Sequence, residues 1–140
     1  MSVIYPRSPR EMMDGWVYLP RFVDKIRLHL AGKLGKDYQE NFLNAGFDAY
    51  WVKSAGVDPQ ALVKVVKESI TDGEVCDWVR KNVRRSGEEK RAFNEYVLNR
   101  GKTGEDVIAR LEQRKKESGL EGRADITCFV DYIDADERRM

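Results

Sequence analysis

Apolar side chains recur along this chain every three or four residues, which is the period of an amphipathic helix. The first long stripe runs from Phe22 to Leu34, begins just after Pro20 and ends among glycines. Each later stripe follows a helix-start signal, in which a capping side chain precedes a proline or an acidic residue. These signals are Asp58-Pro59, Thr71 to Glu74, Ser86 to Glu89 and Thr103 to Asp106. The pattern therefore predicts successive helices that each bury one face.

The periodicity predicts an all-α fold, a compact single-domain bundle or array of six to eight short helices without a significant sheet. The range 1–140 holds no Gly/Ser-rich linker and no internal repeat, so it is expected to form a single helical domain. Ser8-Pro9-Arg10-Glu11 predicts a short first helix that Gly15 interrupts. Further helices are expected from near Pro20, from Asp37 to Asn44, from Phe47 to Ala55, after each of the signals above, and from about Asp125 to Ala135.

Composition narrows the function. The chain has 25 Lys and Arg against 24 Asp and Glu, and its net charge of +1 gives no general attraction to nucleic acid or anionic membranes. No stretch approaches the ~20 apolar residues that span a bilayer, and the N-terminal residues lack the apolar run of a signal peptide. Two cysteines are too few for a disulfide scaffold. We therefore expect a cytoplasmic protein with no membrane association, no cofactor and no metal.

His29 is the only histidine and the one candidate for acid/base chemistry near neutral pH. Asp24 lies five positions earlier on the same predicted helix, so a catalytic dyad would need a carboxylate from elsewhere. Cys76 and Cys128 lack the histidine companion of an activated nucleophile. A small enzyme with His29 as acid/base is one alternative, beside the simpler interpretation of a hydrogen-bonded histidine at the edge of the core.

Two basic stretches raise a second alternative, a weak nucleic-acid binder that would use the helices at residues 80–91 and 110–116. Acidic residues are interleaved with the basic ones, and no RNP-like or basic-region pattern is present. A solvated face with many salt bridges is the favoured interpretation of both stretches. Nucleic acid is therefore the less favoured partner.

Acidic residues crowd the C-terminal end of the last predicted helix, where the helix dipole disfavours negative charge: Asp131, Asp134, Asp136 and Glu137. The simplest interpretation is a solvated acidic end that neighbouring arginines neutralise. A sharper hypothesis docks these acids onto a basic surface near the N-terminus, built from Arg7, Arg10, Arg21 or Lys25. A hard-cation site is a third option, although the spacing is not that of an EF-hand loop.

The segment from Asp14 to Tyr38 combines aromatic and charged side chains beyond what packing requires. Aromatic faces and the forked donors of arginine can line a pocket for a small polar or anionic ligand. The alternative is a helix whose polar face is solvated and whose aromatic residues fill the core. The candidate ligand-binding residues are Trp16, Tyr18, Arg21, Lys25, His29 and Tyr38, with Trp51 and Trp78 adding contact area.

Four stretches, in order along nearly the whole chain, resemble a bacterial family of small proteins catalogued only as a domain of unknown function. They are Pro6 to Glu11, the run Leu19 to Lys25 followed by Leu30 to Leu34, Asp72 to Trp78, and the ending from Asp125 to Glu137. The resemblance implies a small helical bacterial protein and supplies no activity, cofactor or catalytic residue. The leading hypothesis is therefore a non-enzymatic binding module for a partner protein or a small polar ligand, with its oligomeric state left open.

Overall fold

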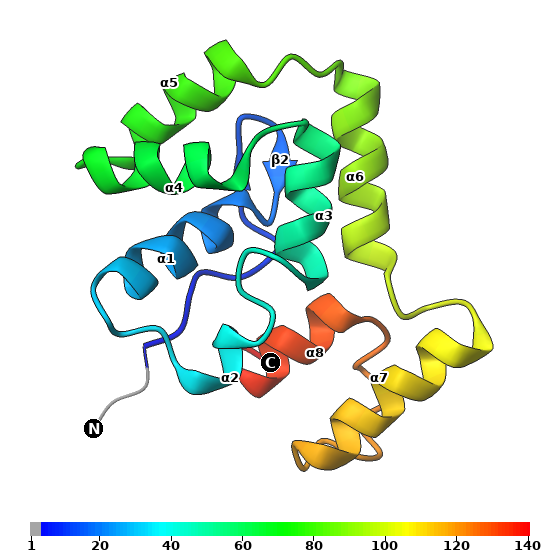
Figure 1. Ribbon diagram of the computed structural model, residues 1–140. Coiled ribbons are helices and arrows are strands. Elements are labelled where there is room, and N and C mark those ends of the chain that lie inside the picture. The colour runs from blue at the N-terminus through cyan, green and yellow to red at the C-terminus, as the bar shows by residue number, and fades with distance from the viewer. Residues whose placement is uncertain (1–3) are drawn as a thin grey trace.

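The computed structural model describes residues 4–140, and within that range it contains eight α-helices and one pair of very short antiparallel strands (Figure 1). The all-α prediction of six to eight helices is confirmed. The elements in chain order are β1 (Met12–Met13), β2 (Trp16–Val17), α1 (Leu19–Leu30), α2 (Lys36–Gln39), α3 (Gly46–Ala55), α4 (Pro59–Glu68), α5 (Asp72–Asn82), α6 (Gly87–Asn99), α7 (Glu105–Glu117) and α8 (Phe129–Asp136).

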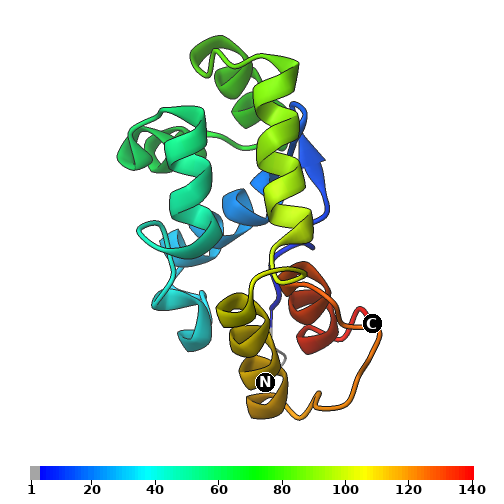
Figure 2. The same ribbon diagram turned by 90° about the vertical axis from the view of Figure 1, so that its right-hand side faces the viewer.

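The helices pack pairwise around one aromatic core. Helix α1 contacts α4, α3 contacts α6, and α8 contacts both α6 and α7; Figure 2 shows α7 and α8 next to each other at the bottom of the view, below α3 and α6. Trp16 lies at the centre, with its ring centroid 5.8 Å from Trp51 and 5.3 Å from Phe93, both in edge-to-face geometry. Edge-to-face aromatic pairs add to the stabilisation from apolar burial. This core fixes α3 and α6 against the N-terminal strands.

Three of the four later helix-start signals form as predicted; at the fourth, α7 begins after Gly104 and Thr103 supplies no side-chain cap. The Asp58 carboxylate accepts from the Gln60 N–H at 2.9 Å, and capping boxes close at Thr71–Glu74 and Ser86–Glu89. Each cap satisfies backbone donors that the first helical turn leaves without partners. These three starts belong to helices α4, α5 and α6, so local sequence alone determines where they begin.

The predicted helix at Ser8 to Glu11 is wrong. Met12 pairs with Val17 and Met13 with Trp16, so the chain forms a hairpin with Asp14 and Gly15 as its two-residue turn. Both turn residues have positive φ, 51° and 82°, as a type I′ turn requires. An Asp-Gly pair between apolar residues is the strongest short-range signal for such a hairpin. That signal overrides the cap-like Ser-Pro pair and delivers Trp16 into the core.

Two other predicted boundaries move. Helix α2 ends at Gln39, well before Asn44, and α8 begins at Phe129, not near Asp125. The segment before α8 is held instead by the Asp131 carboxylate, which accepts from the backbone N–H and the hydroxyl of Thr127 at 2.9 and 3.0 Å. Cys128 is buried as the residue that precedes α8. Side chain to backbone bonds of this kind favour helix entry over helix continuation.

Candidate functional site

The six side chains predicted to line one binding surface lie in different environments. Tyr38 is half-buried and His29 is exposed, and the other four are at most 4% exposed: Trp16, Tyr18, Arg21 and Lys25. The predicted surface is therefore corrected, because these four groups pack inside the protein and are not accessible to a ligand. Trp51, expected to help, is also fully buried in the core. Two buried ionic clusters explain why the polar members are inside.

The first cluster surrounds Asp48, whose carboxylate is completely buried in the first turn of α3. Lys25 Nζ donates to both of its oxygens at 3.0 and 2.9 Å, the Tyr18 hydroxyl donates to one, and the Leu43 N–H donates to the other at 2.8 Å. A buried carboxylate is tolerated only with such partners. Burial raises the pKa of Tyr18 well above its usual value, and the adjacent Asp48 raises it further. Burial also lowers the pKa of Lys25 despite the pull of Asp48.

The second cluster joins α1 to the end of the described chain. Arg21 Nη1 and Nη2 donate to Glu137 Oε1 and Oε2 at 2.8 and 2.6 Å, a bidentate pair. The Tyr38 hydroxyl donates to Glu137 Oε2 at 2.7 Å, and the Arg21 guanidinium lies over the Tyr38 ring, 5.6 Å from its centroid. Burial acts to raise the pKa of Glu137, but the bonds from Arg21 and Tyr38 outweigh it and lower that pKa. Arg21 and Tyr38 thus meet through an acid of the tail.

The hypothesis that the tail acids dock onto the N-terminal basic residues is confirmed. Arg10 forms ion pairs with Asp131 and Asp134, and the Ser8 hydroxyl donates to Asp134 at 3.0 Å. Two of the proposed basic partners are engaged elsewhere, because Arg7 pairs with Asp24 and Lys25 with Asp48. Asp136, the one acid of the four not yet placed, is exposed. Docking therefore neutralises the charge that opposes the dipole of α8.

His29 stands apart from both clusters. Its ring packs on Phe42, with the centroids 4.5 Å apart, and its side chain forms no hydrogen bond or ion pair with any of residues 4–140. Asp24, the nearest acid in the sequence, is held by Arg7 at 2.9 Å. The groups that an acid/base mechanism needs around a histidine are not assembled here. The hypothesis of a small enzyme gains no support from this geometry.

The two basic stretches are partly neutralised. Residues 80–91 span the end of α5 and the start of α6, where Arg80 pairs with Asp77 and Lys90 with Asp14. In the second stretch Lys115 is 4% exposed and its ammonium contacts Glu112 at 3.1 Å. A cation that is buried or paired contributes little to phosphate binding, since affinity depends on the phosphates neutralised. These contacts favour the salt-bridged interpretation of both segments.

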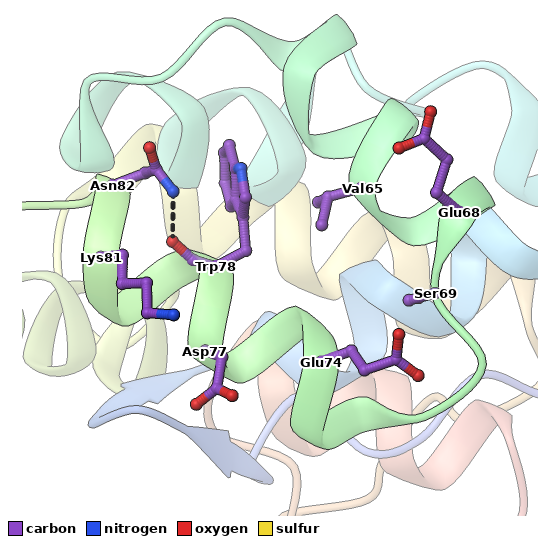
Figure 3. Close-up of a pocket in the computed structure, with 8 residues that line it drawn as sticks. All are labelled: Val65, Glu68, Ser69, Glu74, Asp77, Trp78, Lys81 and Asn82. Carbon is purple, nitrogen blue, oxygen red and sulfur yellow. Dashed lines mark hydrogen bonds between the residues drawn. The ribbon is translucent and has the colours of Figure 1, made fainter.

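A groove lies between α4 and α5, with a volume of about 370 Å³. It lies within the size range of ligand sites. Figure 3 shows Trp78 and Val65 facing each other across the groove from the two helices, with polar side chains around them. The buried faces of α4 and α5, Leu62 and Val66 on one and Val75 and Val79 on the other, point to the core. Packing of those faces therefore leaves Val65 and Trp78 half-buried at the side.

The rim of this α4–α5 groove carries three carboxylates, from Glu68, Glu74 and Asp77, and one ammonium, from Lys81. The Glu74 carboxylate accepts from the Ile70 and Thr71 N–H groups at 3.0 and 3.1 Å, which lowers the pKa of Glu74 and keeps it ionised. Asp77 shares its charge with Arg80 at 3.1 Å. The rim is therefore acidic, and its apolar floor holds an indole ring.

The fold and this groove define a small helical domain with an acidic, tryptophan-containing surface groove, and within residues 4–140 no helix is both long and apolar enough to cross a bilayer. The family model described as Domain of unknown function (DUF5069) matches residues 3–139, and the chain belongs to this family. The resemblance inferred from the sequence is thereby confirmed. A comparison with curated proteins gives no match.

Proposed function

We propose that this domain is a non-enzymatic binding module and that its α4–α5 groove receives a lysine or arginine side chain of a partner protein. One observation carries the proposal: a half-buried indole lies in a groove whose rim holds three carboxylates against one ammonium. A cation over the face of a tryptophan gains roughly 0.5–2 kcal/mol, most when it is desolvated. The carboxylates of Glu68 and Glu74 add attraction of the same sign.

The segment beside the groove supplies a second kind of contact. Ile70 lies in the short connection between α4 and α5, next to the groove residue Ser69, and is 89% exposed. Isolated apolar residues on a surface are common, but one beside a tryptophan groove adds contact area for a partner. A partner segment that carries both a cation and an apolar side chain fits this surface best. A small anionic ligand does not, because the acidic rim repels it.

The free cysteines support a cytoplasmic location. Cys76 and Cys128 form no disulfide, and Cys128 is buried. Proteins of the reducing cytoplasm keep their thiols free. We therefore propose a bacterial cytoplasmic protein, as the sequence predicts, in which the partner protein is also cytoplasmic.

The test uses a defined probe, a short peptide of alternating Lys and Leu with both ends blocked, titrated into ¹⁵N-labelled protein at physiological salt. We expect saturable shifts at the indole N–H of Trp78 and at the backbone of Ser69, Lys81 and Asn82. The same peptide with Glu in place of Lys produces no such shifts. A double variant, Glu68→Gln with Asp77→Asn, weakens binding by about fivefold, because it removes two of the charges that attract the cation.

The matched control makes the same change of charge on α6. Glu88→Gln with Glu95→Gln alters two exposed acids outside the groove, so binding of the Lys–Leu peptide to the groove stays at the wild-type level. Equal weakening by both double variants would show general charge attraction and would overturn the proposal. Shifts that the Glu peptide produces equally well would overturn it too.

A further inference from the structure

A second cleft lies between α7 and the segment 124–127 that follows it, with a volume of about 310 Å³. The turn between α6 and α7 closes one end through Gly101, whose φ is +111°. A Cβ at Gly101 would lie 3.1 Å from the Cys128 Cα and 3.2 Å from the Phe129 N, closer than side chains normally approach. Glycine therefore lets this turn pack against the start of α8. The cleft shares no residue with the α4–α5 groove.

The floor of the α7 cleft is aliphatic. Leu111 and Ile126 are each 2% exposed, and Ile108 on the same helix is 41% exposed at the cleft. Helix α7 is otherwise rich in charged residues. A branched aliphatic side chain that stays half in water on such a helix gains free energy when a ligand covers it. The cleft thus offers one apolar contact that the fold itself does not complete.

The charge of the α7 cleft is positive. Lys115 is fixed, since its ammonium donates to Glu112 at 3.1 Å and to the Arg123 carbonyl at 2.9 Å. Lys102 is different: its ammonium donates to the neutral side chain of Asn99 at 3.0 Å, and it forms no ion pair within residues 4–140. Two ammonium groups and one carboxylate leave one positive charge beside the aliphatic floor. A carboxylate that binds Lys102 would complete this arrangement.

We infer that the α7 cleft binds a carboxylate carried on a short branched aliphatic group, with Lys102 at the carboxylate and Ile108 against the aliphatic part. The same chemistry exists in a free branched-chain acid and at the C-terminus of a peptide that ends in leucine. Capture of a C-terminal carboxylate is a known mode of peptide recognition. The site is independent of the proposed cation groove, from which it differs in sign of charge and in every residue.

The experiment titrates the full chain with isocaproate and with isohexylamine, which has the same carbon skeleton and the opposite charge. We expect saturable amide shifts at Lys102, Ile108 and Thr127 with the acid and none with the amine. Lys102→Met keeps most of the apolar length of the side chain, removes the charge and weakens acid binding by at least about tenfold. Lys116→Met, at an exposed position of α7, leaves acid binding unchanged.

Two tripeptides that end in leucine and are blocked at the N-terminus identify the source of the ligand. One has a free C-terminal carboxylate and the other is amidated. If the peptide with a free carboxylate binds clearly more tightly than isocaproate, the site is assigned to a protein C-terminus. If isocaproate binds more tightly than this peptide, the site is assigned to a small acid. Equal binding of acid and amine would overturn the inference. Wild-type affinity in Lys102→Met would overturn it as well, and because Lys102 is exposed, this variant retains the fold in which the affinity is measured.

Discussion

The Arg21–Glu137 pair and the Arg123–Asp125 pair have the same contact distances and different surroundings. Each is bidentate, with nitrogen–oxygen distances of 2.8 and 2.6 Å in both. The side chains of the first pair are 4% and 3% exposed, whereas those of the second are 37% and 53% exposed. Contact distance therefore does not distinguish the two pairs, and burial does.

Burial determines what happens when one partner is lost. An exposed ion pair exchanges water for a partner at little net gain, so its removal changes stability little. A buried pair has already lost its hydration, and removal of one member leaves the other charge without water or a partner. Charged residues of the sequence thus divide into a few that hold the fold and many that only hydrate it. The following variants test this division, in order of decreasing effect.

Asp48→Ala is expected to have the largest effect. It leaves Lys25, with a side chain 5% exposed, without its carboxylate, and it removes the acceptor of the Tyr18 hydroxyl. We expect the free energy of unfolding to fall by about 3–5 kcal/mol, measured by urea denaturation. The double variant Lys25→Met with Asp48→Leu should recover part of this loss, since it removes both charges. A loss below about 1 kcal/mol in the single variant would show that the burial argument fails.

Glu137→Ala is expected to cost about 2–4 kcal/mol, because it removes the acid that Arg21 and Tyr38 share. Asp136→Ala is the matched control: it removes a neighbouring acid that is exposed, and it leaves the midpoint of urea unfolding nearly unchanged. Equal losses in the two variants would mean that the net charge of the tail, and not the buried pair, holds α8. Truncation after Ile133 removes the whole contact and should lower the melting temperature further than Glu137→Ala.

Low pH is expected to have the next largest effect, because it weakens the buried contacts of Glu137 and Asp131. The pKa values of Glu137 and Asp131 lie below their usual values, because bonds from Arg21 and from Thr127 outweigh the effect of burial. Near pH 4 the unfolded chain takes up protons that the folded protein does not. Stability is therefore complete above about pH 5 and falls as the pH drops through about 4 and below. The melting temperature of the wild-type protein should fall over the same pH range, and that of Glu137→Gln should fall less. An equal fall in the wild-type protein and the variant would implicate other carboxylates.

Arg123→Ala should have the smallest effect. Both members of this pair are solvated, and water replaces the lost contact. The midpoint of urea unfolding is expected to match that of the wild-type protein within the error of the measurement. A clear loss of stability would show that bidentate geometry matters even in water, and the contrast with Arg21 would then rest on geometry as much as on burial.

Local signals predicted more of this structure than distant ones. The starts of α5 and α6 depend on four consecutive residues each, so Thr71 and Ser86 could be read directly. The hairpin at Asp14-Gly15 has an equally local signal, but the preceding Ser8-Pro9 pair resembles a helix start and favours the wrong element. Docking of the tail was predictable because acids at the C-terminal end of a helix need positive partners.

The candidate site was less predictable, because it depends on which helices meet. Asp48 follows an aromatic residue in the sequence, and nothing nearby indicates that Lys25, 23 positions earlier, will reach it. The same burial removed Tyr18 and Arg21 from the predicted surface. The sequence predicts Trp78 to add contact area, but its groove exists only because α4 and α5 pack side by side. Exposure is a property of the assembled helices, and sequence period determines only which face of each helix is apolar.

The partner of Arg21 is synthesised late. Glu137 follows Arg21 by 116 positions, which at ~5–20 residues per second corresponds to roughly 6–23 s of translation. During that time the guanidinium has no carboxylate with which to enter the interior. The N-terminal half therefore emerges from the ribosome without one of the contacts that stabilise its native arrangement, and chaperones that bind nascent chains have a long window in which to meet it.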